Sequence, residues 1–132
     1  MAKSKLSDLS PFTRGYLTAA YWTSDESDDL GWQDYRATKG PENMHKRLSL
    51  KGFLCAIAAC EAFKAANVEM LAQAGDSEQN GIDFWLTRNG HGSGFSDRDY
   101  DESVRDVLTK AARKMGESDL YKADNGKLYF SR

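Results

Sequence analysis

Apolar residues recur every three or four positions in segments 11–22 and 100–115, and this spacing predicts an amphipathic helix in each segment. The first helix should begin after Ser10, since serine is a preferred N-cap and the proline that follows it fits the first helical position. The later helix should begin near Asp99, because Asp99 and Glu102 have the spacing of a capping box.

A longer helix is predicted over residues 50–74, between an N-cap at Ser49 and a stop at Gly75. Its apolar positions fall within an arc of about 120°, taking about 100° per residue, so this arc should face the core. The positions are Leu50, Phe53, Leu54, Ile57, Cys60, Val68 and Leu71. Phe63 and Met70 lie on a second side, where they would contact another element or a partner.

Residues 82–88 alternate between apolar and polar side chains, which is the pattern of a strand with one buried face. Three apolar side chains would face the core, and Trp85 would point away from it. Trp85 would then be covered by the acidic segment 23–40, the interpretation we favour, or would form part of a binding surface.

The C-terminal residues carry the clearest local signal. Asn125-Gly126 is a strong two-residue hairpin turn, which predicts that residues 119–123 pair with residues 127–131. The apolar pairs on one face of this hairpin would be Tyr121 with Phe130 and Ala123 with Leu128.

Together these elements predict an α+β fold, with three helices packed on one face of a small three-stranded sheet that ends in a C-terminal β-hairpin. The strand 82–88 and the hairpin would be joined through a right-handed crossover. The length of 132 residues predicts a single domain over 1–132, and a hydrophobic content of 40% is enough for a packed core.

Segment 23–40 is rich in Asp, Glu, Ser and Gly, which predicts a loop. Trp32 and Tyr35 should pack this loop back onto the domain. Its acidic residues at 25–29 lack the turn glycine and the closing glutamate of a calcium loop, so we interpret them as a solvated surface.

The charge balance and the cysteine content narrow the functional classes. The formal net charge is −2, from 18 Lys and Arg against 20 Asp and Glu, which is unlike a basic nucleic-acid module. A small basic cluster at an expected exposed helix start is too weak to change this interpretation. It comprises His45, Lys46, Arg47 and Lys51. Nucleic acid therefore stays open as a partner without support from the net charge.

No apolar run reaches the roughly 20 residues of a membrane span, and the N-terminus lacks the apolar centre of a signal peptide. Cys55 and Cys60 would point about 140° apart on one helix, which predicts free thiols in a reducing compartment. No metal-ligand or cofactor pattern is present, so we predict no metal site and no cofactor.

The densest set of polar side chains follows the predicted strand, in the glycine-rich residues 87–100. Glycines there allow close approach of a ligand, and the N-terminus of the following helix would favour an anion. The candidate binding residues are Arg88, Asn89, His91, Ser93, Asp97 and Arg98. His91 is the candidate acid, base or phosphate contact, with Asp97 or Asp99 to orient it. No nucleophile is marked by spacing, so no catalytic residue is assigned.

A purely structural interpretation of this loop is favoured over catalysis. The glycines would let the chain turn, the aspartates would cap the next helix, Arg88 would pair with Asp97, and His91 would hold backbone carbonyls. A binding role lies between these two interpretations, with Phe95 either in the core or presented to a partner.

Residues 83–99 resemble a motif of small proteins encoded by tailed bacteriophages. They read Asp-Phe-Trp-Leu-Thr-Arg-Asn-Gly-His-Gly-Ser-Gly-Phe-Ser-Asp-Arg-Asp, and the family often has a bulky aromatic where this chain has Ser96. Segments 9–12, 60–63, 116–121 and 124–129 are similar to further parts of those proteins, so the resemblance spans most of the chain. It implies a phage source and the cytoplasm of the infected host cell, and it implies no activity.

The function expected from these features is that of a small phage accessory protein that binds a host or phage macromolecule, most plausibly a protein. The alternative is a small enzyme or a nucleotide- or phosphate-binding protein that uses the glycine-rich loop 88–99. Neither a membrane partner nor an oligomeric state is indicated.

Overall fold

The fold is built around two helices, α1 (Pro11–Thr23) and α5 (Ser77–Arg88), which pack closely against each other. We describe it from a computed structural model that covers residues 8–24, 39–91 and 93–131. The close approach depends on two glycines. A Cβ atom on Gly15 would collide with the carbonyl oxygen of Glu78, and one on Gly81 would collide with that of Phe12.

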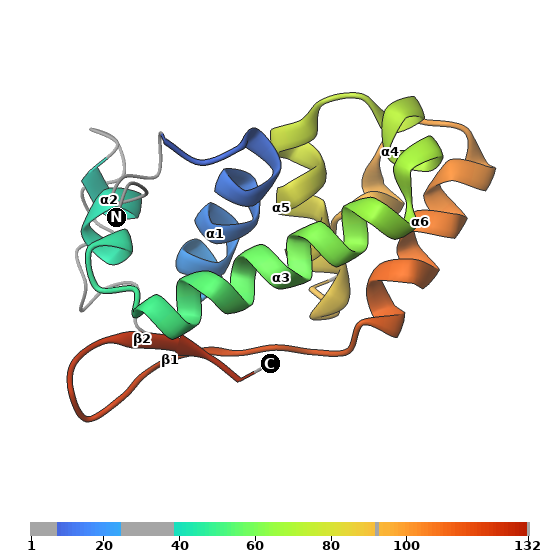
Figure 1. Ribbon diagram of the computed structural model, residues 1–132. Helices are drawn as coiled ribbons and strands as arrows, with labels where there is room; N and C mark the ends of the chain where they lie inside the picture. The colour runs from blue at the N-terminus through green and yellow to red at the C-terminus, as the bar shows by residue number, and fades with distance from the viewer. Residues whose placement is uncertain (1–7, 25–38, 92, 132) are drawn as a thin grey trace.

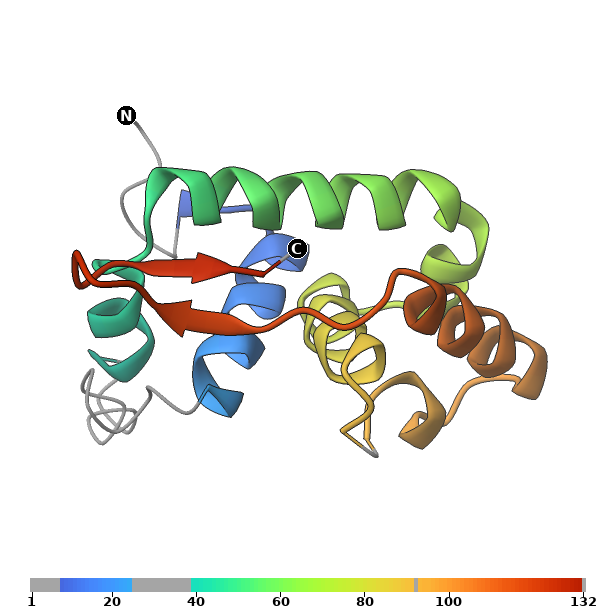
Figure 2. The same ribbon diagram turned by 90° about the horizontal axis from the view of Figure 1, so that it is seen from below.

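The other helices surround this pair. Helix α3 (Leu50–Ala66) lies across α1 and α5, and α4 (Val68–Ala74) turns away from its end (Figure 1). Helix α6 (Glu102–Lys114) packs against α4 and α5 at one end of the molecule. Helix α2 (Lys39–His45) and the hairpin lie at the opposite end (Figure 2).

The remaining elements are short. A 3-10 helix, η3 (Phe95–Asp97), connects α5 to α6, and the strands β1 (Leu120–Lys122) and β2 (Leu128–Phe130) form an antiparallel two-stranded sheet. The outer edge of β2 is covered by the chain before α3, because Leu128 exchanges backbone hydrogen bonds with Arg47 and Ser49.

Aromatic rings fill the centre of the molecule. Phe63 of α3 stacks on Phe84 of α5 with ring centroids 4.1 Å apart, and Phe95 of η3 also stacks on Phe63, with centroids 6.0 Å apart. Tyr16 and Trp85 meet edge to face at 5.2 Å. These contacts join α1, α3, α5 and η3 in one core.

The predicted three-stranded sheet is wrong, because residues 82–88 form the second half of α5. The N-cap of this helix is Asp76, whose side chain accepts a hydrogen bond from the backbone N–H of Gln79. The alternating pattern does not indicate a half-buried strand here, because the polar residues Asp83 and Thr87 are buried, as Phe84 is. The described residues therefore form a mostly helical fold with one two-stranded sheet, and no strand crossover.

The predicted helix 50–74 is two helices, because the chain breaks at Asn67. The Asn67 side chain donates to the carbonyl of Phe63 at this break. The predicted core arc is also rotated: Leu50 and Leu54 are exposed, while Phe63 is buried. Since α3 is apolar on almost every side, the pattern alone could not select the buried one.

The predicted hairpin register is wrong by one residue. Leu120 pairs with Phe130, and the turn has three residues because Ala123 donates to the carbonyl of Lys127. Gly126 occupies the left-handed position of this turn, with φ of 83°. A one-residue shift exchanges the two faces, so Tyr121 lies outside with Tyr129 instead of in the core.

Several local predictions are confirmed. Ser10 and Ser49 are the N-caps of α1 and α3, and the Ser49 side chain accepts from the backbone N–H of Gly52. Cys55 and Cys60 are free thiols. The predicted capping box of Asp99 with Glu102 is wrong, because α6 begins at Glu102 with Asp101 as its N-cap.

The basic cluster differs from the prediction at His45. This residue ends α2 and is buried, with its Nδ1 atom 2.7 Å from the Tyr21 hydroxyl. Lys46, Arg47 and Lys51 are exposed. The cluster therefore presents three cations, without the histidine, to solvent.

In the ranges that the structure covers, no helix is long and apolar enough to cross a membrane, and no group of three or more His, Cys, Asp or Glu side chains could hold a metal ion. Most of the predicted acidic loop 23–40, including Trp32 and Tyr35, lies outside the described residues. The packing of that loop, and its covering of Trp85, therefore stay predictions.

Candidate functional site

Arg88, the first candidate binding residue, is buried and fully engaged inside the fold. Its guanidinium donates to the carbonyl oxygens of Gly116 (2.7 Å) and Met115 (3.2 Å) and to the hydroxyl of Tyr16 (3.0 Å). The two carbonyls lie at the C-terminus of α6, where a cation is favourable. Burial raises the pKa of Tyr16 far above its usual value, although Arg88 beside it acts in the opposite direction.

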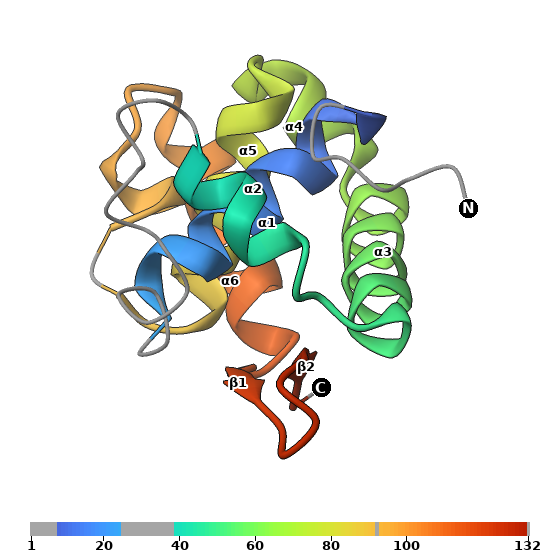
Figure 3. The same ribbon diagram turned by 90° about the vertical axis from the view of Figure 1, so that its left-hand side faces the viewer.

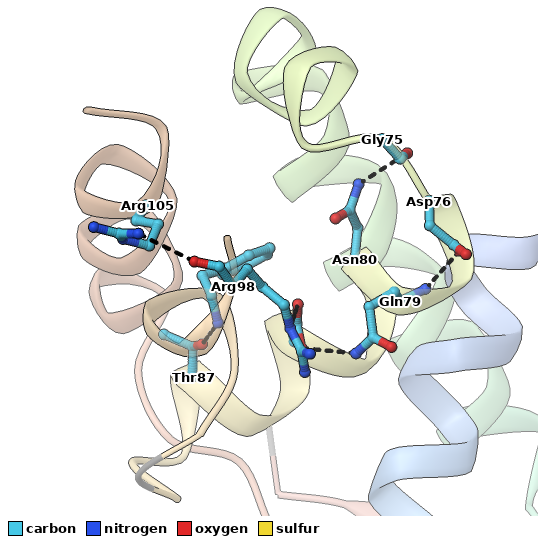
Figure 4. Close-up of polar contacts among 9 residues, drawn as sticks. Gly75, Asp76, Gln79, Asn80, Thr87, Arg98 and Arg105 are labelled. Atoms are coloured by element: carbon cyan, nitrogen blue, oxygen red, sulfur yellow. Dashed lines mark hydrogen bonds and ion pairs between the residues drawn. The ribbon is translucent and has the colours of Figure 1, made fainter. Parts of the chain in front are cut away.

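Arg98 is held by a carboxylate of α5. Its Nε and Nη2 atoms donate to the two carboxylate oxygens of Asp83 at 2.9 Å and 3.0 Å, and Gln79 donates to the same carboxylate at 3.0 Å (Figure 4). The Asp83 side chain has no exposed surface, while that of Arg98 is 34% exposed. The hydrogen bonds with Asp83 raise the pKa of Arg98. The predicted pairing of Arg88 with Asp97 is therefore wrong. Arg88 is bonded to backbone carbonyls, and Arg98 is the arginine that pairs with a carboxylate.

The turn that carries Arg98 is fixed by further contacts. Thr87 accepts a hydrogen bond from the backbone N–H of Phe95, and Arg105 donates to the carbonyl of Arg98 (Figure 4). Gly94 has φ of 122°, and a Cβ atom there would collide with the Thr87 hydroxyl. Phe95 lies in the core. This half of the glycine-rich loop is therefore a structural joint between α5 and α6.

The other half of the loop reaches the surface. Asn89 joins α5 to the C-terminal segment, since it donates to the carbonyl of Trp85 (3.0 Å) and accepts from the N–H of Ser118 (2.8 Å). The backbone N–H of His91 donates to the carbonyl of Leu86, and its imidazole is exposed. Within the described ranges, neither this imidazole nor the side chains of Ser93 and Asp97 form a hydrogen bond.

An open pocket of about 480 Å³ lies beside Asn89 and His91. Three segments that are far apart in the sequence form its walls: the end of α1, the end of α5, and the chain around β1. The lining residues are Ala20, Thr23, Ser24, Trp85, Asn89, His91, Glu117, Ser118, Asp119, Leu120, Tyr121 and Ser131. Of the six candidate residues, only Asn89 and His91 line this pocket.

The pocket is polar and has a negative bias. Glu117 and Asp119 contribute carboxylates, and among the lining residues that the structure describes there is no Lys or Arg. The C-termini of α1 and α5 also end at its wall, and helix C-termini carry partial negative charge. Trp85 presents little surface, because its indole N–H is bonded to Thr23 at 2.8 Å. Such a site suits a cationic or hydrogen-bonding ligand better than an anion.

The sequence could not reveal most of this pocket. The spacing placed Arg88 and Arg98 in one loop, but folding turns both guanidiniums towards internal acceptors. Glu117, Asp119 and Tyr121 were not selected, because they lie in a plain stretch after α6 whose path past α1 and α5 has no local signal. Comparison of the chain with known protein families, with curated proteins and with solved structures finds no match.

Proposed function

We propose that this chain is a non-enzymatic phage accessory protein that binds a host or phage protein through the pocket beside His91, in the cytoplasm of the infected cell. The observation that carries the proposal is the division of the glycine-rich loop. Arg88 and Arg98 hold the fold together, whereas Asn89 and His91 border an open polar pocket. A pocket open to the surface suits recognition of a protein segment.

The charge of the site favours this proposal over nucleotide or phosphate binding. The two arginines that an anion would need are already bonded to carbonyls and to Asp83. These two guanidinium groups are thus bonded away from the pocket, which has Glu117 and Asp119 at its wall. We therefore expect no stabilisation in a thermal-shift screen with nucleotides and inorganic phosphate, since a ligand stabilises only the state that it binds.

The proposal is tested by affinity capture from infected-cell lysate, using the wild-type chain and two charge-reversed variants. Asp119→Arg reverses a charge at the pocket, and Asp106→Arg makes the same change on the exposed side of α6. We expect a reproducible protein partner with the wild type and Asp106→Arg, and at least about tenfold less of it with Asp119→Arg. Equal capture by both variants, or no partner with the wild type, contradicts the proposal.

A further inference from the structure

The outward side of α3 is apolar along most of its length. The helix lies along one flank of the molecule (Figure 3), and Leu50 and Leu54 are each more than half exposed. Taking about 100° per residue, this outward side lies opposite the side of α3 that carries the buried Phe63. Its exposed residues are Leu50, Lys51, Leu54, Ala58, Glu61, Ala62 and Ala65. A continuous apolar surface of this kind marks a site of interaction with another molecule.

Large and small side chains are divided between the two halves of this side. Leu50, Leu54, Ala58 and Ala62 follow one another at intervals of four residues, which places them in a row along the helix. When a second copy of α3 runs antiparallel to the first, the register that brings Leu54 level with Ala58 also brings Leu50 level with Ala62. Each large side chain then meets a small one, so the two helices can pack closely. A parallel second copy would set leucine against leucine and leave gaps at the alanines.

The two charged residues on this side fit the same register. Glu61 follows Lys51 by ten residues, so the antiparallel register brings Lys51 of one copy level with Glu61 of the other. Two-fold symmetry repeats this contact, whereas a parallel pair would set Lys51 against Lys51. Glu61 is 3.4 Å from Lys64 of its own helix, but this exposed pair is weak and leaves the carboxylate free to turn. The outward side of α3 is therefore complementary to itself in size and in charge.

We infer that two copies of this chain associate through the outward sides of their α3 helices, which run antiparallel about a two-fold axis level with the middle of the Leu54–Ala58 segment. The inference goes beyond the proposed function, because none of the residues of α3 lines the pocket. One helix face is smaller than the standard interface of about 1,600 Å², so we expect a dissociation constant on the order of 10–100 µM. In dilute solution the chain is then a monomer, and unfolding there reports on a single copy.

Sedimentation velocity of the full chain, over concentrations from about 1 µM to about 1 mM, tests the association. We expect the wild type to sediment as a monomer at the lowest concentration and largely as a dimer at the highest. Leu54→Gln should weaken the association at least about tenfold, because it puts a polar side chain at the centre of the contact. Val68→Gln makes a similar change at an exposed apolar residue of α4, outside the row, and should change the dissociation constant by less than about twofold.

The register is tested by exchanging the charges. Lys51→Glu makes both charged positions negative, and Glu61→Lys makes both positive. Each variant alone should associate at least about tenfold more weakly than the wild type, while an equimolar mixture of the two should associate about as strongly as the wild type. Recovery in the mixture also shows that both variants are folded. Lys110→Glu, on the exposed side of α6, is the matched control and should leave the association unchanged.

Several results would overturn the inference. One is a wild type that stays monomeric at about 1 mM, and another is an association that neither Leu54→Gln nor the single charge reversals weaken. A mixture that associates no better than its two components alone excludes the antiparallel register. If the wild type is monomeric and Leu54→Gln loses the partner captured from lysate, a different protein covers α3. The proposed function is judged separately, by the capture of a partner with Asp119→Arg.

Discussion

Helices α3 and α5 depart in opposite ways from the rule that apolar side chains are buried and polar side chains are exposed. Helix α5 buries the polar side chains Asp83, Thr87 and Arg88, each 5% exposed or less. Helix α3 is almost wholly apolar in sequence, yet Leu50 is 71% exposed and Leu54 is 55% exposed. In Figure 3, α3 lies along one flank of the molecule, while α5 is enclosed.

The difference shows that close packing and specific hydrogen bonds decide whether a helix of this fold lies at the centre or at the surface. Helix α5 reaches the centre because Gly15 and Gly81 let it approach α1. The buried side chains of Asp83, Thr87 and Arg88 are tolerated there because each finds a partner, for example Asp83 with Arg98. Helix α3 needs only one side, the one with Phe63, to cover that centre.

The largest effect should come from alkaline pH, which ionises side chains that are buried or half-buried: Tyr16 beside Arg88 of α5, Tyr100 beside Asp83 of α5, and Cys60 of α3. Burial raises the pKa of Cys60 from 9.0 to about 12 and that of Tyr100 from 10.0 to about 12, and it also raises the pKa of Tyr16. The fold keeps these groups protonated, so stability should be complete below pH 9 and should be lost as the pH rises towards 12.

This pH dependence is measured by urea unfolding, followed by circular dichroism at a series of pH values. Tyrosinate absorbance should appear together with unfolding. In the Cys55→Ala/Cys60→Ala double variant the decline should begin later, from the ordinary tyrosine pKa of 10.0, because burial raises the pKa of both thiols and both are gone. A stability that is flat across this range would show that these groups titrate without regard to the fold.

The next largest effect should come from Gly81→Ala, which separates α5 from α1. Alanine is the better helix former by about 1 kcal/mol, so propensity alone predicts a gain. The added Cβ would collide with the carbonyl oxygen of Phe12, and we expect a net loss of at least about 3 kcal/mol in urea unfolding. Ala58→Val, which enlarges an exposed side chain of α3, should cost no more than about 0.5 kcal/mol.

A smaller loss should follow Arg98→Ala, which leaves the buried carboxylate of Asp83 without its cation. Breaking a buried pair costs about 3–5 kcal/mol, and we expect about 2 kcal/mol here because Arg98 is partly exposed. The double variant Asp83→Asn with Arg98→Ala should recover part of this loss, since no unpaired buried carboxylate is left. If the double variant is as unstable as the sum of the single ones, the pair has no role in tolerating Asp83.

What the sequence predicts well in this protein is chemistry confined to a few neighbouring residues. The starts of α1 and α3 are set by serine N-caps, and the turn of the hairpin by Asn125-Gly126, so each could be located. The hairpin register could not be fixed in the same way. The same Asn-Gly pair serves a two-residue or a three-residue turn, and packing of Leu120 against the core decides between them.

The rest depends on partners that are distant in the sequence. Alternation in residues 82–88 indicates a strand only if the polar positions face solvent, and here Asp83 faces Arg98 and Thr87 faces the backbone of Phe95. The candidate loop was located, but its arginines could not be assigned to the structure, because their acceptors belong to other helices. The pocket brings together α1, α5 and the C-terminal segment, and no pattern within any one of them predicts the other two.

The smallest effect should come from a substitution on the exposed face of α3. Leu54→Gln replaces an exposed leucine that the apolar arc had placed in the core, so it should change the free energy of unfolding by no more than about 0.5 kcal/mol. Phe63→Ala on the buried side of the same helix should cost about 3–5 kcal/mol, because it empties the ring stack with Phe84 and Phe95. A loss above about 2 kcal/mol for Leu54→Gln would mean that this side of α3 is covered in solution, and that the contrast with α5 is weaker than the monomer shows. If Leu54→Gln is neutral at every protein concentration, α3 is held by one side alone, and its other leucine, Leu50, is also free to vary.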